Sequence, residues 1–269
     1  MKQVPDTTGC FEEVQLSSGI VIVERSGHGP PIILVHGEDG SLFLRPFIEA
    51  LGAHKEVHLI NLPGWGVTPG SKDIEGVDDL GLVLSDYTMS QFASPTPVIG
   101  LSLGAWVTAQ AAVFGQHLFS KVVLVSPIGI KTTAREERSY VDIWATDPGE
   151  LRHLLYGDPS RIPDLRDLDD DEFLRLAHAA EAVARHGWAP YLYDPKLARR
   201  LVRLTSQTLI VTGTEDHFVL EPSFGERWAA LVTGASEHVA IQGVGHRAEE
   251  EAPHELAAVI HKFLESQPS

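Results

Sequence analysis

The chain has 269 residues, of which 43% are hydrophobic and 22% charged, so it is long enough to bury the core of one large domain or two small ones. Aspartate and glutamate outnumber lysine and arginine by 37 to 21, which gives a net charge of −16 at pH 7. Because a surface of this charge repels polyanions, the composition excludes nucleic acids and anionic membranes as expected partners.

Short apolar segments alternate with amphipathic ones along the first half of the chain. β-Branched residues predict a strand over 14–24, and the apolar run at 31–35 predicts a strand buried on both faces. The stretch 87–120 contains no Asp, Glu, Lys or Arg, but its prolines and glycines favour a buried strand, turn and helix over a membrane span. Periodicity predicts these further elements in chain order: a helix at 41–53, a strand at 57–60, a helix at 77–93, a strand at 97–101, a helix at 105–114 and a strand at 122–125.

Residues 131–204 interrupt this alternation. They contain no clear strand, and helical periodicity occurs near 148–156 and 171–186. We therefore expect a helical cap at 131–204, inserted into a core made of 1–130 and 205–269. The alternation elsewhere indicates βαβ units and a mostly parallel sheet with helices on both faces. The core is expected to end with a strand at 209–212, a helix at 222–232, a strand at 239–242 and a helix at 251–265.

The strongest chemical signal is the sequence Gly-Leu-Ser-Leu-Gly at 100–104. It fits G-x-S-x-G and lies between a predicted strand and a predicted helix, which is the context this motif requires. Small residues two before and two after Ser102 let a sharp strand-to-helix turn close. The hydroxyl is then exposed above the sheet, where backbone amides at the helix N-terminus stabilise developing negative charge.

Three further strand ends carry polar groups. The loop at 36–40 follows a predicted strand and either supplies a second oxyanion amide or is an ordinary turn. Asp216 follows another strand end, where an acid can orient a histidine, and Glu215 is its alternative. His246 lies on a glycine-flanked loop before the last helix. The order Ser102, Asp216, His246 is the order that this triad takes on α/β architectures.

With these residues the chain resembles the α/β-hydrolase family over nearly its whole length. The resemblance implies a mostly parallel sheet of eight strands with one antiparallel strand near the start, and a cap inserted before the strand that leads to the acid. It implies Ser102 as nucleophile, His246 as general base and Asp216 as its orienter. The backbone amides of Leu103 and Glu38 would form the oxyanion hole. The resemblance is carried by the segments 36–37, 61–66, 100–104, 213–217, 245–246 and 250–264.

Three features depart from the family pattern or refine it. Ser102 argues against the relatives with an aspartate nucleophile, such as haloalkane dehalogenases and epoxide hydrolases. The Glu38-Asp39 pair places carboxylates beside an oxyanion hole, where they oppose the developing negative charge. We expect the Glu38 side chain to point away or to pair with a cation, so that only its amide serves. Ser126 stands at a strand end where some relatives carry the acid, which strengthens Asp216.

Aromatic residues near the elbow and in the cap are candidates for an apolar substrate pocket, and the alternative is that they only pack the cap onto the sheet. Leu103 is expected to face this pocket, so the site favours an uncharged, partly apolar group. The candidate substrate-binding residues are Trp106, Trp144, Trp188 and Tyr191.

The sequence predicts no metal and no cofactor. Its 13 histidines include no H-E-x-x-H spacing, and its one cysteine excludes a metal-binding cysteine pair. The acidic run at 167–172 lacks the spacing of a calcium loop and precedes a helical pattern, which favours helix capping. The lone Cys10 and the absence of an apolar leader in the first residues predict a cytoplasmic protein. We expect a small-molecule substrate, no membrane insertion and a monomer or homodimer.

The leading hypothesis is a cofactor-independent serine hydrolase that cleaves a small carboxylic ester or lactone through an acyl-enzyme. Its activity should rise with pH as His246 loses its proton. The alternatives are a C–C bond hydrolase, a perhydrolase or an amidase on the same triad. A further alternative is a small-molecule receptor with a vestigial triad.

Overall fold

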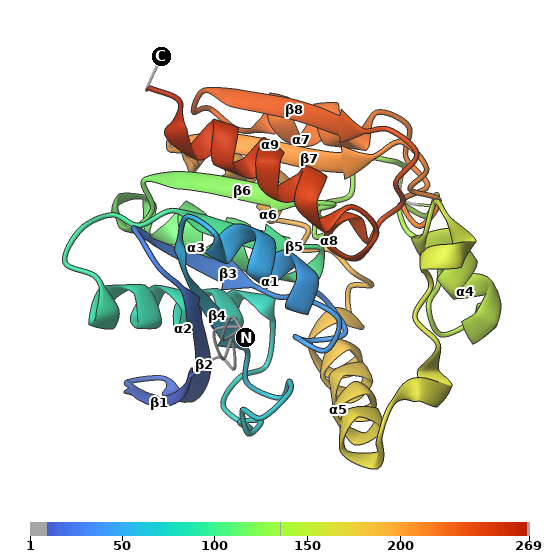
Figure 1. The fold of residues 1–269 in the computed structure, drawn as a ribbon. Helices are drawn as coiled ribbons and strands as arrows, with labels where there is room; N and C mark the ends of the chain where they lie inside the picture. Colours follow the sequence, from blue (N-terminus) through green and yellow to red (C-terminus); the bar gives the residue numbers. More distant parts are fainter. Residues whose placement is uncertain (1–9, 135, 268–269) are drawn as a thin grey trace, which may run out of the picture.

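The computed structural model describes residues 10–134 and 136–267, which build an eight-stranded sheet with the order β1-β2-β4-β3-β5-β6-β7-β8 (Figure 1). β2 is antiparallel to both of its neighbours, and the strands from β4 to β8 are parallel. The predicted sheet with one antiparallel strand near its start is confirmed. The strands are β1 (Cys10–Leu16), β2 (Gly19–Gly27), β3 (Pro31–Val35), β4 (Glu56–Asn61), β5 (Val98–Leu101), β6 (Lys121–Val125), β7 (Gln207–Gly213) and β8 (Ser236–Ile241).

The single strand predicted over 14–24 is wrong. Those residues belong to a hairpin in which Leu16 of β1 pairs with Gly19 of β2. The two residues between them make the turn, and Gly19 has a φ of +129°, which a glycine adopts without a steric penalty. The turn sequence Ser-Ser-Gly at 17–19 separates the two strands, and the prediction overlooked it because β-branched residues resume directly after it.

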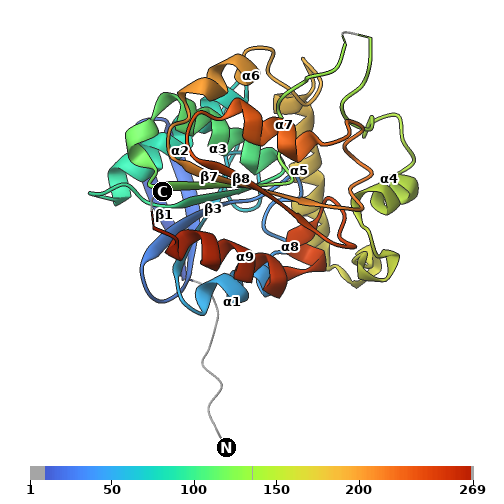
Figure 2. The same cartoon turned by 90° about the horizontal axis from the view of Figure 1, so that it is seen from above.

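Helices cover both faces of the sheet (Figure 2). α1 (Arg45–Gly52), α8 (Ala248–Glu251) and α9 (Pro253–Glu265) lie on one face. α2 (Val77–Gln91), α3 (Leu103–Phe114) and α7 (Phe224–Leu231) lie on the other. Because successive side chains of a strand point to opposite faces, β3 contributes to two cores: Ile33 and Val35 to one, Ile32 and Leu34 to the other. Burial on both faces explains the continuous apolar sequence of this strand.

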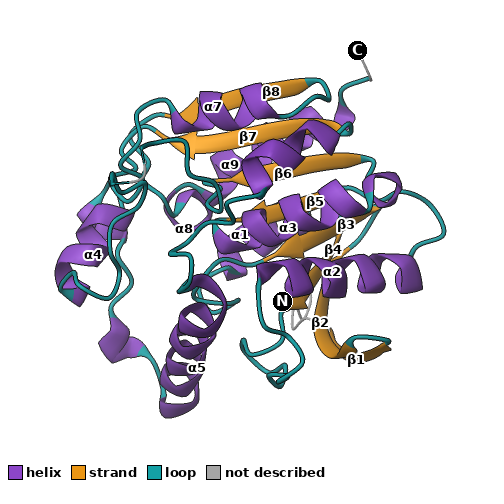
Figure 3. Cartoon of the chain, turned by 180° about the vertical axis from the view of Figure 1, so that it is seen from behind, coloured by secondary structure: helices purple, strands orange, loops and turns teal. Residues whose placement is uncertain are grey.

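The segment between β6 and β7 contains α4 (Pro148–Leu155), α5 (Asp170–Gly187) and α6 (Leu197–Arg200). α4 and α5 lie beyond the end of the sheet where the parallel strands terminate (Figure 3). The chain is back on the core before α6, where the Gln110 side chain of α3 donates to the Asp194 carboxylate at 2.8 Å. The division into a core and a cap at 131–204 stays a prediction.

The acidic run at 167–172 caps a helix, as predicted. The Asp169 carboxylate accepts from the Glu172 backbone N–H at 2.8 Å, and the Glu172 carboxylate accepts from the Asp169 N–H at 3.0 Å. This reciprocal pair satisfies free donors at the start of α5. Among the helices of the described residues, none is long and apolar enough to span a bilayer.

His36 joins the ends of β3 and β4. Its Nδ1 lies 2.8 Å from the Gly37 carbonyl oxygen, and its Nε2 accepts from the Leu62 N–H at 3.1 Å. This pairing requires a neutral ring that carries its proton on Nδ1. Complete burial lowers the pKa of His36 from 6.5 to about 4.

The lowered pKa of His36 makes stability depend on pH. Between these two pKa values the unfolded chain binds a proton that the folded chain does not, so stability falls as the solution is acidified. We expect the free energy of unfolding to lose about 2 kcal/mol through His36 between pH 6.5 and pH 5. Urea unfolding of the wild type and of His36→Gln at both pH values measures this, because the advantage of the wild type should shrink on acidification. An advantage that stays constant with pH would contradict the prediction.

Candidate active site

Ser102 lies at the tight turn between β5 and α3 with a φ of +46°. A side chain at Gly100 would bring its Cβ within 2.5 Å of the Gly104 carbonyl oxygen, and one at Gly104 would collide with the carbonyl of His36. The two glycines therefore let the turn close, as the sequence predicted. The Ser102 N–H donates to the Val125 carbonyl of β6 at 2.9 Å, which fixes the turn to the sheet.

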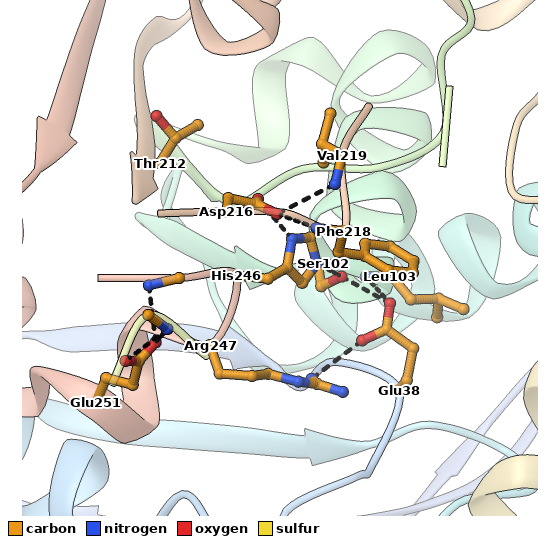
Figure 4. Close-up of polar contacts among 12 residues, drawn as sticks. Glu38, Ser102, Leu103, Thr212, Asp216, Phe218, Val219, His246, Arg247 and Glu251 are labelled. Atoms are coloured by element: carbon orange, nitrogen blue, oxygen red, sulfur yellow. Dashed lines mark hydrogen bonds and ion pairs between the residues drawn. The ribbon is translucent and has the colours of Figure 1, made fainter. Parts of the chain in front are cut away.

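The structure brings the three predicted triad residues together (Figure 4). Ser102 Oγ lies 2.7 Å from Nε2 of His246, and Nδ1 of His246 lies 2.7 Å from Oδ2 of Asp216. Burial by itself lowers the pKa of His246, but the Asp216 and Glu38 carboxylates outweigh it and the pKa is raised. The imidazole is therefore positioned and electrostatically prepared to hold a proton.

Asp216 is held by its own loop after β7. Its Oδ1 accepts from the backbone N–H groups of Phe218 at 3.0 Å and Val219 at 3.1 Å, which leaves Oδ2 for His246. Burial by itself raises the pKa of Asp216. The charge of His246 and these hydrogen bonds lower it by more, so the net shift of the pKa is downward. Glu215, the alternative acid, lies 3.8 Å from His217 and has a half-exposed side chain.

The loop that carries His246 is fastened to the segment after α4. The Glu251 carboxylate accepts from the Gly245 N–H at 2.7 Å and from the Gly157 N–H at 3.0 Å. The His246 N–H donates to the Leu155 carbonyl at 2.7 Å. Sequence reasoning missed Glu251, although an acidic cluster directly after the glycine-flanked histidine is a signal for such a role.

Glu38 points into the site rather than away from it. Its Oε1 accepts from Ser102 Oγ at 2.6 Å and from the Leu103 N–H at 3.2 Å. Its Oε2 forms an ion pair with Arg247 at 3.1 Å, so the expected pairing with a cation is confirmed. Arg247 also pairs with Asp39 at 3.0 Å. Sequence reasoning did not single out Arg247, although it is the cation next to His246 in a strongly acidic segment.

A cavity of about 300 Å³ reaches this site from beneath the α4–α5 segment. Glu38, Asp39, His246 and Arg247 form its polar end. The rest of its lining is mainly apolar and includes Phe43, Ile143, Trp144, Leu151, Leu176 and Phe218. An apolar cavity with a few convergent polar groups is the usual form of a small-molecule site.

Of the four aromatic candidates, Trp144 lines this cavity, whereas Trp106, Trp188 and Tyr191 do not. Trp106 packs in the core, where it fills the space beside Gly129. Trp188 is 57% exposed and makes an edge contact with Trp144. The hydroxyl of Tyr191 donates to the Val141 carbonyl at 2.6 Å and faces another hollow. Position in the sequence did not distinguish these environments, because they depend on how the segment between β6 and β7 packs on the core.

Comparison with known proteins identifies the family. A model of the alpha/beta hydrolase family matches residues 32–259. The chain belongs to the alpha/beta hydrolase family. A related pimeloyl-[acyl-carrier protein] methyl ester esterase of Xanthomonas campestris pv. campestris (strain B100) is 26% identical over 264 residues, covering 91% of this chain and 99% of that protein. The protein is therefore an enzyme, a hydrolase of the carboxylesterase type, as predicted.

Solved structures of other alpha/beta hydrolases share this fold. A putative lipase from Acinetobacter baumannii AYE superposes with a TM-score of 0.76 at 21% identity, covering 96% of this chain and 91% of that one. A meta-cleavage product hydrolase from Pseudomonas fluorescens IP01 also has a TM-score of 0.76, at 18% identity, covering 94% and 97% of the two chains. These similarities establish the fold.

Proposed function

We propose that the enzyme cleaves a small, uncharged, partly apolar carboxylic ester or lactone through an acyl-enzyme. Ser102 Oγ attacks the carbonyl carbon while its proton passes to Nε2 of His246. The alcohol leaves with that proton. Water then attacks the acyl-enzyme with His246 again as the base, which releases the acid and regenerates Ser102.

The observation that carries this proposal is the continuous chain from Ser102 Oγ through His246 to Asp216, with both contacts at 2.7 Å. A general base must lie within hydrogen-bond reach of the proton that it removes, and a carboxylate on the far nitrogen fixes the tautomer. The oxyanion that forms during attack would be held by the backbone amides of Leu103 and Glu38.

The cavity supports the choice of substrate class. Its lining is mainly apolar, and its volume of about 300 Å³ suits a small acyl group. Glu38 and Asp39 at its polar end repel an anionic group near the scissile bond. The name of the related Xanthomonas enzyme includes a methyl ester. The leaving group of a methyl ester is uncharged, as this end of the cavity favours.

Intact-mass analysis after treatment with a small fluorophosphonate tests the mechanism, since the probe reacts with an activated serine and needs no knowledge of the substrate. We expect one adduct on the wild type, located by peptide mapping to the peptide that contains Ser102, and none on Ser102→Ala. A folded wild type that forms no adduct, or an adduct that survives in the variant, would contradict the proposed nucleophile.

A substrate panel then tests the reaction class. We expect hydrolysis of methyl and ethyl esters with short to medium apolar acyl chains, with lactones as a second group, and weaker activity on esters with an anionic acyl end. The comparisons are a ring-fission diketone for a C–C hydrolase, an assay of peracid formation for a perhydrolase, and an amide for an amidase. Preference for the diketone would assign a C–C hydrolase, and tight binding of ligands without turnover would assign a receptor.

A further inference from the structure

The position that an oxyanion would take is filled by a side chain of the enzyme itself. An oxyanion in this family of sites is bound by the amide that follows the nucleophile. Here the Leu103 N–H donates to Oε1 of Glu38 at 3.2 Å, and Oε1 also accepts from Ser102 Oγ at 2.6 Å. Figure 4 shows the Glu38 carboxylate directed toward Ser102 and Leu103 with one oxygen and toward Arg247 with the other. A negatively charged oxygen therefore already occupies the place where the reaction would create one.

Glu38 also covers the nucleophile. Ser102 is only 2% exposed and does not belong to the described residues that line the cavity, whereas Glu38 and His246 do. The backbone of Glu38 is fixed, because its carbonyl oxygen accepts from the Trp65 indole N–H at 2.8 Å. A substrate carbonyl therefore reaches the Leu103 amide only if the Glu38 carboxylate rotates away from it.

The proton of Ser102 has two acceptors in this arrangement. A hydroxyl donates one hydrogen bond, so it cannot serve Glu38 and His246 at once. Burial raises the pKa of Glu38, but Arg247 and His246 outweigh it and keep the carboxylate ionised. With His246 protonated, its Nε2–H donates to Ser102 Oγ and the Ser102 O–H donates to Glu38 Oε1. Each of the two donors then has one acceptor. In that state His246 cannot act as a base.

Arg247 provides a place for the displaced carboxylate. Its guanidinium is buried and contacts Glu38 at 3.1 Å, Asp39 at 3.0 Å and Glu249 at 3.9 Å. When the Glu38 side chain rotates, its carboxylate can keep the ion pair with Arg247 and lose the hydrogen bond to Ser102. If Glu38 is removed, the Asp39 carboxylate at 3.0 Å still pairs with the buried cation, which makes Glu38 open to substitution.

We propose that the Glu38 carboxylate closes the oxyanion site of the resting enzyme, restrains the Ser102 hydroxyl, and is displaced by the substrate's carbonyl oxygen. This inference rests on the proposed acyl-enzyme mechanism. Displacement removes a negative charge from the neighbourhood of His246, which then releases its proton to water. The neutral imidazole accepts the Ser102 proton as Oγ bonds to the carbonyl carbon and the carbonyl electron pair moves onto oxygen at the Leu103 amide.

The test compares wild type, Glu38→Ala and Glu38→Gln in the rate of fluorophosphonate labelling between pH 5 and pH 9. The charged groups near His246 are Asp216, Glu38, Arg247 and Glu249, so removing Glu38 alone should move the midpoint of the pH–rate curve to lower pH in both variants. Alanine also vacates the oxyanion site, so its plateau rate should rise roughly tenfold or more; one oxyanion donor contributes about 10²–10³-fold.

Glu38→Gln is the matched control for occupancy, because its amide keeps the shape of the side chain and can still accept from Leu103. Its midpoint should move like that of alanine, while its plateau stays below that of alanine. Plateau rates and midpoints equal to those of the wild type in both folded variants would overturn the role of Glu38 and leave the proposed function standing. Absence of an adduct in all three folded proteins would overturn both proposals.

Discussion

Replacing Ser102 with alanine should reduce kcat/KM for the best ester substrate by about 10⁴-fold or more, the effect seen when a triad nucleophile is removed. Alanine retains the Cβ and the backbone turn, so the fold should be preserved. It lacks the oxygen that forms the acyl-enzyme, and water held by the remaining groups is a poor substitute. Steady-state kinetics at enzyme concentrations high enough to detect the residual rate, with circular dichroism as the folding check, measure the effect.

Ser126 offers a closely matched control for this variant. It also follows a parallel strand, it is 2% exposed, and it has a φ of +42° against +46° for Ser102. Ser126→Ala therefore removes an equally buried hydroxyl from an equally strained turn at the neighbouring strand end. We expect its turnover to stay within a few-fold of the wild type. A large loss in both variants would indicate a structural effect of the turns, and retained activity in Ser102→Ala would require another nucleophile.

The fold and the triad were predictable because their signals are local. Strands buried on both faces give short apolar runs, and the carboxyl ends of parallel strands meet at one edge of the sheet. The glycines at 100 and 104 mark a turn that side chains would prevent from closing. Ser102, Asp216 and His246 therefore come together once the strand order is known.

The state of the oxyanion site was not predictable in the same way. The sequence left open whether Glu38 points away or pairs with a cation. The cation comes from far along the chain: the Arg247–Asp39 pair joins residues 208 positions apart and depends on where the last loop meets the β3 end. The aromatic candidates failed for a related reason. α3 is almost completely buried, so Trp106 packs within the core between α3 and its neighbours and does not reach the cavity. Long-range packing, which periodicity does not encode, decides such orientations.

Replacing Asp216 with asparagine should lower kcat by about 10⁴-fold at neutral pH, because it reverses the polarity of one hydrogen bond. The orientation of the new amide follows from the loop. The N–H groups of Phe218 and Val219 both donate to Oδ1, so the carbonyl oxygen of the asparagine would stay there. Its NH₂ group would then face Nδ1 of His246, which would have to accept.

A histidine that accepts at Nδ1 carries its proton on Nε2 and cannot take the Ser102 proton. The variant also loses the carboxylate that raises the pKa of His246, so its remaining activity should have a pH midpoint below that of the wild type. Kinetics from pH 5 to pH 9 measure both effects. A loss of less than about tenfold at neutral pH would show that Asp216 does not orient the base.

Glu215→Gln is the matched control, since it removes the neighbouring carboxylate on the same loop. Glu215 has a side chain that is 48% exposed, and its carboxylate lies 3.8 Å from His217, so its loss should change turnover by no more than a few-fold. If both variants fell together, loss of charge at the loop would explain the result. A loss confined to Asp216→Asn assigns the effect to the single bond at Nδ1, because the two substitutions remove the same charge one residue apart.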